Sequence, residues 1–264
     1  VVDHLDEFSK IMDEIDDAND VTVYVRLATP PGGASEHLSN KFGASIDEAV
    51  SLLSRVQSAG CCPALSFHVG SQCYDPRSYQ TALSMVAETL RRGNVRIGAL
   101  DVGGGFPASY PNMVSPPLGE FIKTIVEGVR AIAVDDKITL LCEPGRALVA
   151  DGVSVVTKIY LRRGDRLYIN DGIFGNFSES SFNEYQLPAR LIRLENANEK
   201  TTRPFTVFGP TCDSNDQLSQ LVNLPEDVGE GDWIEFSLLG AYSNALNTNF
   251  NGFGGCMFVH IDEL

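Results

Sequence analysis

The stretch CEPGRA, residues 142–147, follows a short apolar run and places a carboxylate, a proline, a glycine and a guanidinium close together. An apolar run that ends in such a turn is typical of a β-strand leading to the ligand-binding edge of a parallel sheet. At that edge, Glu143 can face a ring nitrogen, while Gly145 and Arg146 can contact a phosphate. Taken alone, the same turn can equally be a surface salt bridge.

A pyridine nitrogen and a phosphate occur together in pyridoxal 5′-phosphate (PLP). The electron-sink chemistry of this cofactor needs an acidic partner at the ring nitrogen. The turn therefore makes PLP a candidate cofactor, provided that other strand-end loops carry matching groups.

Upstream of this turn, strand and helix patterns alternate four times. Apolar, β-branched runs predict strands, and amphipathic periodicity predicts helices. The predicted strands are 21–28, 63–69, 95–102 and 138–142, and the predicted helices are 3–17, 46–59, 75–91 and 118–134. This alternation predicts a parallel sheet with active groups at the carboxyl ends of its strands, as in a TIM barrel. Four units are only half of a closed barrel, so either the sheet is open or the other half is not in this chain.

Two of the other predicted strands also end in loops with ligand-binding potential. His68 and Ser71 lie in FHVGS, where a neutral ring can lie on a planar cofactor and a hydroxyl can donate to a phosphate. Gly103–Gly105 can form a tight turn whose N–H groups surround an anion. A single strand-end histidine is more often a buried core residue, and glycines often simply end strands. Three such loops in consecutive units are much less expected by chance.

After about residue 150 the pattern changes to β-strands with almost no helical periodicity. A turn at Arg163-Gly164-Asp165 predicts a hairpin, and 195–203 predicts an exposed loop. Further strands are predicted in RPFTVFGP (203–210), GDWIEFSLLGAYS (231–243) and GGCMFVHI (254–261). We therefore predict two domains, a partial (β/α) barrel at 1–150 and a mostly antiparallel β domain at 151–264.

The composition excludes several classes of function. The net charge is −15, from 35 acidic and 20 basic residues, which argues against a nucleic-acid partner. The six cysteines show no metal-ligand spacing and no CxxC pair, so we expect reduced thiols and no metal site. An apolar run of membrane-spanning length and a signal-peptide pattern are both absent from the sequence, which predicts a soluble cytoplasmic protein without a membrane partner.

Eight motifs, in order along nearly the whole chain, match one family pattern. They are RLAT (26–29), LSNKFGA (38–44), SFHVGSQC (66–73), LDVGGGFP (100–107), CEPGRALVA (142–150), YINDGIFGNF (168–177), FGPTCDSND (208–216) and LLGAYSNALNTNFNGF (238–253). On these motifs the sequence resembles the fold-type III, PLP-dependent decarboxylases of ornithine, lysine, arginine and diaminopimelate. It is most similar to the eukaryotic-type ornithine decarboxylases, because Thr211-Cys212-Asp213 departs from the diaminopimelate branch.

The resemblance implies the C-terminal part of an alanine-racemase-like barrel followed by a β domain. It implies PLP as cofactor and decarboxylation of a basic amino acid, of ornithine or lysine type, to a diamine for polyamine biosynthesis. It also implies a homodimer with shared active sites, in which Lys41 and Asp216 resemble a pair that bridges the interface.

Roles for single residues follow from the resemblance alone. His68 would stack on the cofactor ring, with Arg26 nearby and Glu143 at the ring nitrogen. Cys212 would protonate the carbon that loses CO₂, and Asp213 and Asn183 would lie at the distal ammonium of the substrate. The phosphate would be held by Ser71, Gly104, Gly105, Gly145, Arg146 and Tyr242.

Two departures from the family pattern bear on function. The family's Schiff-base lysine ends an early barrel strand, and none of the lysines here fits that context. We therefore expect that the N-terminal part lies upstream of Val1, and that this chain alone is inactive and folds poorly. At Phe182-Asn183 the family carries an aromatic residue and Asp, so the substrate can differ from ornithine unless Glu184 substitutes. The alternatives are a catalytically inactive, decarboxylase-like regulatory or binding protein and, less expected, an amino-acid racemase.

Overall fold

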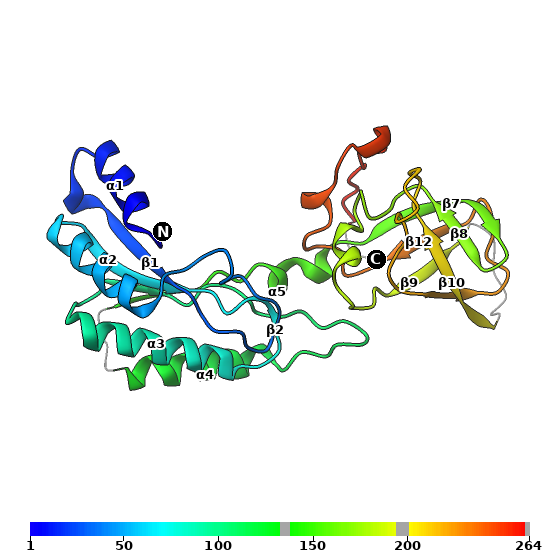
Figure 1. Cartoon of the computed structure of the whole chain (residues 1–264). Coiled ribbons are helices and arrows are strands. Elements are labelled where there is room, and N and C mark those ends of the chain that lie inside the picture. Colours follow the sequence, from blue (N-terminus) through cyan, green and yellow to red (C-terminus); the bar gives the residue numbers. More distant parts are fainter. Residues whose placement is uncertain (133–137, 194–200, 262–264) are drawn as a thin grey trace. The chain divides into compact units, whose positions relative to one another are not determined.

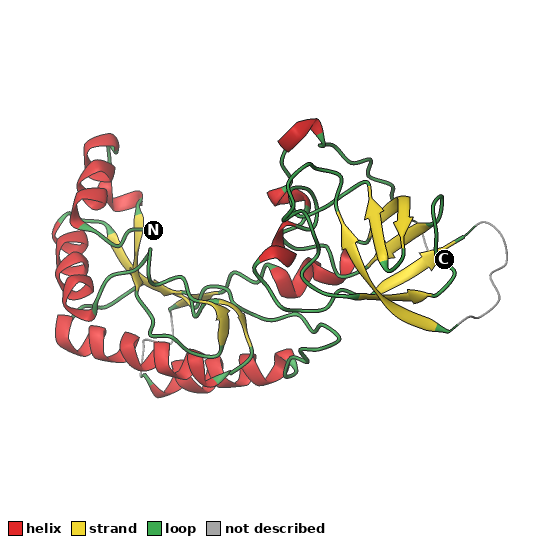
Figure 2. Cartoon of the chain, turned by 45° about the vertical axis from the view of Figure 1, so that its right-hand side comes forward, coloured by secondary structure: helices red, strands yellow, loops and turns green. Residues whose placement is uncertain are grey.

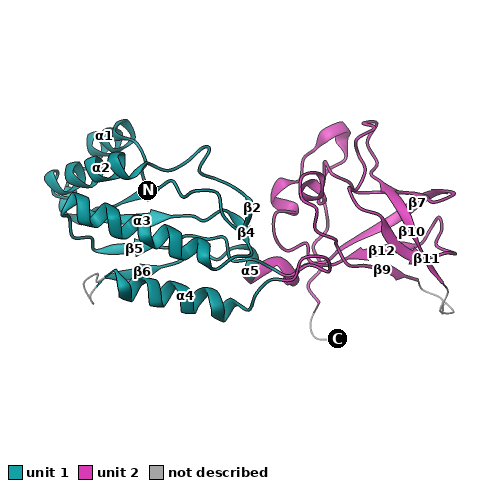
Figure 3. Ribbon diagram, turned by 60° about the horizontal axis from the view of Figure 1, so that its bottom comes forward, with its two compact units in different colours: residues 1–108, 115–147 teal, residues 109–114, 148–264 magenta. Residues whose placement is uncertain are grey.

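The computed structural model describes residues 1–132, 138–193 and 201–261 of the chain. These residues form two compact units (Figure 3). Unit 1 comprises Val1–Ala108 and Ser115–Ala147, and unit 2 comprises Ser109–Val114 and Leu148–Leu264. Each unit has its own buried core, so each is described by itself.

Unit 1 runs from blue to green in Figure 1. It is built on a parallel sheet with the strand order β1-β3-β5-β6. Its strands are β1 (Thr22–Leu27), β3 (Cys62–Phe67), β5 (Ala99–Asp101) and β6 (Thr139–Leu141), and its long helices are α1 (Leu5–Glu14), α2 (Ile46–Ser58), α3 (Arg77–Gly93) and α4 (Leu118–Ala131). Helix α3 packs between α2 and α4. The predicted alternation is confirmed, although β5 is shorter than the predicted strand at 95–102 and residues 133 and 134 of the last predicted helix lie outside the described residues.

The apolar periodicity of the sequence explains which faces are buried. In α2, the buried residues Ala49, Leu52, Leu53 and Val56 recur at helical spacing and face the core. In β1, Val23, Val25 and Leu27 are buried on one face, while Tyr24 and Arg26 on the other face are only half-buried. Strand β1 thus has one packed face and one that carries polar groups, whereas all three residues of β6 are exposed.

A second, small sheet in unit 1 was not predicted from the sequence. It pairs β2 (Ala34–Glu36) with β4 (Ser71–Cys73) in antiparallel register. Both strands are only three residues long and lie in segments that are rich in glycine and polar residues. Such short strands form because a partner strand is close in the tertiary structure, which local propensity does not reveal.

Unit 2 contains a six-stranded sheet with the order β11-β10-β8-β7-β12-β9. Its strands are drawn in yellow in Figure 2. The strands are β7 (Val155–Arg163), β8 (Arg166–Ile169), β9 (Ala189–Ile192), β10 (Thr202–Phe208), β11 (Val222–Pro225) and β12 (Trp233–Phe236). All its pairs are antiparallel except β10 with β8, and β11 also contacts β9, which makes the sheet barrel-like. The predicted hairpin at 163–165 is confirmed as the β7–β8 turn.

Short helices occupy several connections of both units. They are α5 (Arg146–Val149), η1 (Ala18–Asp20), η2 (Ala150–Gly152), η3 (Ser178–Ser181), η4 (Asn244–Leu246) and η5 (Phe250–Gly252). Among the described residues, no helix has the length and apolar character that crossing a bilayer requires.

One strand prediction in unit 2 is wrong. The segment 254–261 forms no strand, and the side chains of Met257 and Phe258 are 87% and 71% exposed. Its β-branched and aromatic residues favour extended backbone, but a strand also needs a neighbour with free backbone groups. Most of the loop predicted at 195–203 lies outside the described residues, and Thr202 and Arg203 already belong to β10.

Candidate cofactor site

Three polar residues lie side by side at the carboxyl ends of the strands of unit 1. Arg26 on β1 is in register with Ser66 on β3, and Ser66 with Asp101 on β5, so the three side chains share one face of the sheet. The hydroxyl of Ser66 is buried and has no hydrogen-bond partner among the described residues. Because buried hydroxyl groups are normally paired, the Ser66 hydroxyl is an unsatisfied polar group on the face that carries Arg26 and Asp101.

His68 lies two residues beyond Ser66, where β3 has ended. Its Nδ1 accepts a hydrogen bond of 3.1 Å from the Gly70 N–H, so the neutral ring carries its proton on Nε2. Burial, together with the positive charge of Arg26, lowers the pKa of His68 to about 4. The ring is therefore neutral at physiological pH.

The loops that follow β3, β5 and β6 meet at Gly104. A Cβ atom at this position would lie 2.8 Å from Nε2 of His68 and 2.7 Å from the carbonyl oxygen of Glu143. Only glycine permits this approach, because real Cβ atoms do not come so close to other heavy atoms. His68, Gly104 and Glu143, each predicted from a separate motif, are thus neighbours in the structure.

In the glycine loop the carbonyl groups of Gly103, Gly104 and Gly105 are hydrogen-bonded, and the Gly103 N–H donates to Asp101 (2.8 Å). The carbonyl oxygens of Gly103, Gly104 and Gly105 accept hydrogen bonds from the Glu143 N–H (2.8 Å), the Tyr79 hydroxyl (2.9 Å) and the Cys73 N–H (2.9 Å). In a trans peptide the N–H points away from the carbonyl, so the N–H groups of residues 104–106 point away from these partners. Within the described part of the chain, the N–H groups of Gly104 and Gly105 meet no acceptor. Such groups suit an anion.

The remaining predicted residues of unit 1 lie on the neighbouring turns. Glu143 is exposed after β6, and around Gly145 no atom lies within 4 Å of an added Cβ. Arg146 is buried at the start of α5, and Ser71 is half-buried at the start of β4. A carboxylate, a neutral imidazole, free N–H groups and a guanidinium are the groups that a charged pyridine ring and a phosphate need, so these residues fit PLP.

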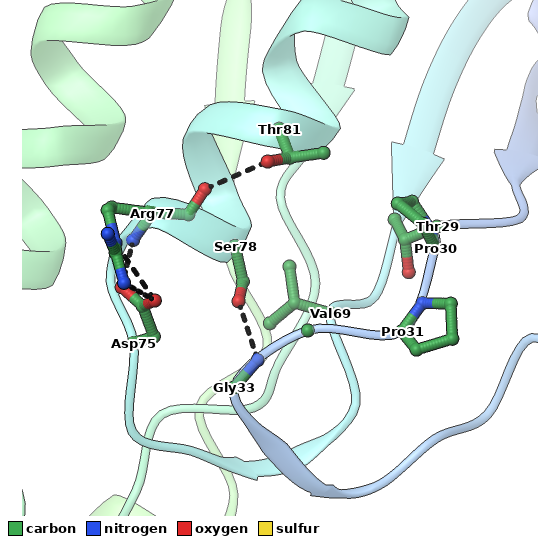
Figure 4. Close-up of a pocket in the computed structure, with 10 residues that line it drawn as sticks. Thr29, Pro30, Pro31, Gly33, Val69, Asp75, Arg77, Ser78 and Thr81 are labelled. Carbon is green, nitrogen blue, oxygen red and sulfur yellow. Dashed lines mark hydrogen bonds and ion pairs between the residues drawn. The ribbon is translucent and has the colours of Figure 1, made fainter.

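A surface depression of about 370 Å³ lies beside these loops (Figure 4). It is bounded by residues 29–33 and by the first turns of α3, where the Gly33 N–H donates to Ser78 (3.1 Å) and Arg77 pairs with Asp75 (2.7 Å). It shares Val69 with the FHVGS loop but contains none of the predicted site residues.

In unit 2, Cys212 lies on an exposed loop between β10 and β11. Its N–H and its Sγ lie 3.3 and 3.2 Å from the same side-chain oxygen of Asn251. The neighbouring carboxylate of Asp213 accepts the N–H of Asn215 (2.8 Å). Tyr242 is 49% exposed, and its backbone is left-handed with φ 53°.

The side chain of Asp216 is buried beneath the loop that carries Cys212 and binds its backbone. Its carboxylate is 1% exposed and accepts hydrogen bonds from the Ile173 N–H (3.0 Å) and from the N–H (3.0 Å) and hydroxyl (2.7 Å) of Thr211. The carboxylate therefore holds this loop against the segment that contains Ile173.

Asn183 is buried in unit 2, whereas Glu184 is exposed. The Asn183 side-chain amide donates to the carboxylate of Glu179 (3.3 Å), a residue that is itself 6% exposed. The turn around η3 brings these two residues together, because the Asn183 N–H also bonds to the Glu179 carbonyl oxygen (3.1 Å). The carboxylate that binds the Asn183 side chain is thus that of Glu179, whereas the substitution by Glu184 at the substrate stays a prediction.

Sequence reasoning missed the residues that hold the loops in place. Tyr79 follows the apolar spacing of α3 and resembles an ordinary core residue, although its hydroxyl binds the glycine loop. Burial raises the pKa of Tyr79, so this hydroxyl remains a donor. Gln72 and Asn251 act through side-chain amides at positions that only the tertiary structure identifies.

Comparison with known proteins identifies the family. The model of the family described as "Pyridoxal-dependent decarboxylase, pyridoxal binding domain" matches residues 1–150. The chain belongs to this pyridoxal-dependent decarboxylase family. The family resemblance of the motifs and the predicted fold class are thereby confirmed.

By their names, the relatives of this decarboxylase-family chain include both decarboxylases and an antizyme inhibitor. It is 32% identical over 258 residues to an ornithine decarboxylase of Cricetulus griseus and 30% identical over 255 residues to Antizyme inhibitor 2 of Xenopus laevis, each match covering 87% of the chain. The structure of the Paramecium bursaria Chlorella virus arginine decarboxylase bound to agmatine is similar, with a TM-score of 0.82 and 29% identity over 96% of this chain and 68% of that one. The chain spans about half the length of these curated relatives, 54% of each.

Proposed function

We propose that this chain is part of a PLP-dependent enzyme that decarboxylates a basic amino acid, of ornithine or lysine type, to a diamine. The observation that carries the proposal is the meeting of three strand-end loops at Gly104, with the neutral His68 ring and unpaired N–H groups around it. The relatives named for ornithine and arginine decarboxylation support a basic substrate. The negative charge of the chain favours cationic substrates weakly.

The residues of unit 1 divide the binding of PLP between its ring and its phosphate. When bound, PLP supplies an electron sink for the electron pair that remains at the α-carbon when CO₂ leaves. Glu143 would keep the ring nitrogen protonated, and the neutral His68 would cover the ring without adding a second positive charge. The phosphate ligands would be Gly104, Gly105, Gly145, Arg146 and Ser71, with Arg26 near the ring.

We propose that residues of unit 2 bind the substrate and supply the proton that the α-carbon takes up after CO₂ has left. Cys212 would donate its thiol proton to the α-carbon after CO₂ has left. Asp213 and Asn183 would bind the distal ammonium group, and Tyr242 would be a further phosphate ligand. We propose that these residues act in a homodimer, which sedimentation analysis of the full-length protein tests.

Binding of PLP to the full-length protein is the first test. Gly104→Ala inserts a Cβ where His68 and Glu143 leave no room, so it should weaken PLP binding at least tenfold in equilibrium dialysis. Gly119→Ala is the matched control, because no atom lies within 4 Å of a Cβ at that position. Equal PLP affinity of Gly104→Ala and the control would contradict the proposed site.

Activity is tested with the full-length protein. We expect CO₂ release from ornithine, lysine or arginine, and a loss of diamine formation of at least tenfold in Cys212→Ala. Cys256→Ala is the control, since Cys256 is also exposed and also contacts an asparagine oxygen (Asn244, 3.3 Å). Release of no CO₂ from any of the three amino acids would reject the enzyme proposal.

A second candidate function is that of a decarboxylase-like regulatory or binding protein. It is supported by the 30% identity to Antizyme inhibitor 2 and by the placement of the lysines. Among the described residues, Lys10 and Lys123 lie on helices, Lys41 in a loop and Lys158 on β7, so none follows a strand of the parallel sheet. Full-length protein that binds a polypeptide partner but releases no CO₂ would favour this candidate.

A further inference from the structure

Gln72 joins two of the loops that form the candidate site. Its side-chain amide accepts the Ala108 N–H (2.7 Å) and donates to the Ala108 carbonyl oxygen (3.0 Å) and to the Tyr74 hydroxyl (2.6 Å). The amide thus pairs with both backbone groups of one residue, as a neighbouring strand would. It is 2% exposed, so water does not compete for these bonds.

The backbone of Gln72 is in a conformation that favours glycine. Its φ is 52°, in the left-handed region, where a residue with a Cβ is disfavoured. Gly70 and Gly105, which flank the same contact, also have positive φ, but they have no side chain. A glutamine that keeps such a conformation must be held there by its surroundings, and strained residues of this kind concentrate at functional sites.

The bonds of Gln72 complete the anchoring of the glycine loop. Tyr79 and the Cys73 N–H hold the carbonyl groups of Gly104 and Gly105, and Gln72 fixes the end of the loop at Ala108. These contacts turn the carbonyl groups toward the protein, which leaves the N–H groups of Gly104 and Gly105 free for an anion, whereas that of Gly103 donates to Asp101.

We propose that Gln72 is a positioning residue that holds the glycine loop in its anion-binding conformation. The proposal rests on the proposed function in one respect, namely that the anion is the phosphate of PLP. Gln72 itself touches the loop backbone and not the reacting atoms. Its loss should therefore weaken phosphate recognition while recognition of the pyridine ring is retained.

The test is made in the full-length protein and compares Gln72→Gly with wild type. Glycine adopts positive φ without steric cost, so this variant removes the amide and preserves the backbone. We expect amide hydrogen exchange at Ala108 to become at least tenfold faster, and PLP affinity to fall at least tenfold while affinity for pyridoxal, which lacks the phosphate, stays within twofold. Gln80→Ala, an exposed glutamine on α3, is the control and should change none of these values.

Two further variants separate the contributions of Gln72. Gln72→Ala also lacks the amide but retains a Cβ in the left-handed region, so it should match Gln72→Gly in exchange and be less stable. Gln72→Glu retains an acceptor for the Ala108 N–H and loses both donors, so exchange at Ala108 should fall between wild type and Gln72→Gly.

The outcomes distinguish this inference from the proposed function. Exchange at Ala108 within twofold of wild type in Gln72→Gly would overturn the positioning role. So would an equal loss of affinity for PLP and pyridoxal, because that indicates general damage to the fold. If the full-length wild-type protein binds no PLP, the proposed function fails, and the exchange measurement alone decides whether Gln72 orders the loop.

Discussion

The ring of His68 is buried in the folded protein, so its pKa differs between the folded and the unfolded chain. In the unfolded chain a histidine takes up a proton below about pH 6.5, whereas folded His68 does so only near pH 4. Between these values the unfolded state binds more protons, so folding stability rises with pH across the window and is lost as the pH falls through it. The contribution of this one ring can reach about 3 kcal/mol.

The variant His68→Asn tests this pH dependence. Asn retains an acceptor for the Gly70 N–H but cannot be protonated, so its stability should decline less than that of wild type between pH 7 and pH 4.5. Urea unfolding at a series of pH values measures the difference between the two proteins, in which the shared carboxylates cancel. His4→Asn, at an exposed position, is the control. Parallel pH curves for wild type and His68→Asn would contradict the prediction.

In unit 2, the buried carboxylate of Asp216 accepts three hydrogen bonds. In Asp216→Asn one oxygen becomes an NH₂ group that faces a donor, so we expect a loss of about 2–4 kcal/mol in the free energy of unfolding. The fluorescence of Trp233 during urea unfolding measures it, because the sequence contains a single tryptophan. Asp165→Asn, on the exposed β7–β8 turn, should cost much less, and equal losses would reject the role given to Asp216.

At the scale of the elements, α2 shows how local sequence can fix a helix start. The Ser45 side chain accepts the Glu48 N–H, and the Glu48 carboxylate accepts the Ser45 N–H (2.8 Å), which together form a capping box. We expect Ser45→Ala to lower the free energy of unfolding by about 1 kcal/mol. Ser51→Ala, on the exposed surface of the same helix, should have no such cost, because alanine is the better helix former there. Circular dichroism during urea unfolding separates the two variants.

Elements with long apolar periods, such as α2, α3 and β1, could be predicted because their buried faces repeat at 3.6 or 2 residues. The short pair β2–β4 could not, since it forms by tertiary proximity. The strand prediction at 254–261 was wrong for the opposite reason. The residues of this segment have high β propensity, but no strand among the described residues pairs with them.

At the scale of the molecule, the two cores have no residue in common. Leu65 is fully buried in unit 1, and Phe205 is fully buried in unit 2. Truncation of either side chain to alanine should lower the free energy of unfolding by about 2–5 kcal/mol. Since Trp233 lies in unit 2 and the long helices lie in unit 1, fluorescence and far-ultraviolet circular dichroism follow different units. We expect Leu65→Ala to shift mainly the dichroism transition and Phe205→Ala mainly the fluorescence transition. Coincident shifts of both signals in both variants would contradict independent cores.

The sequence by itself determined the class of fold, the alternation of strands and helices in unit 1 and the three loops at its strand ends. These properties depend on periodicity and on residue types such as Gly104, whose role follows from having no side chain. Only the tertiary structure decided that His68 and Glu143 crowd around Gly104, that the Asn183 amide binds the Glu179 carboxylate, and that Gln72 and Tyr79 hold the glycine loop. The physical reason is that a hydrogen bond between residues far apart in the chain depends on where the packed elements bring them, and no local pattern encodes that distance.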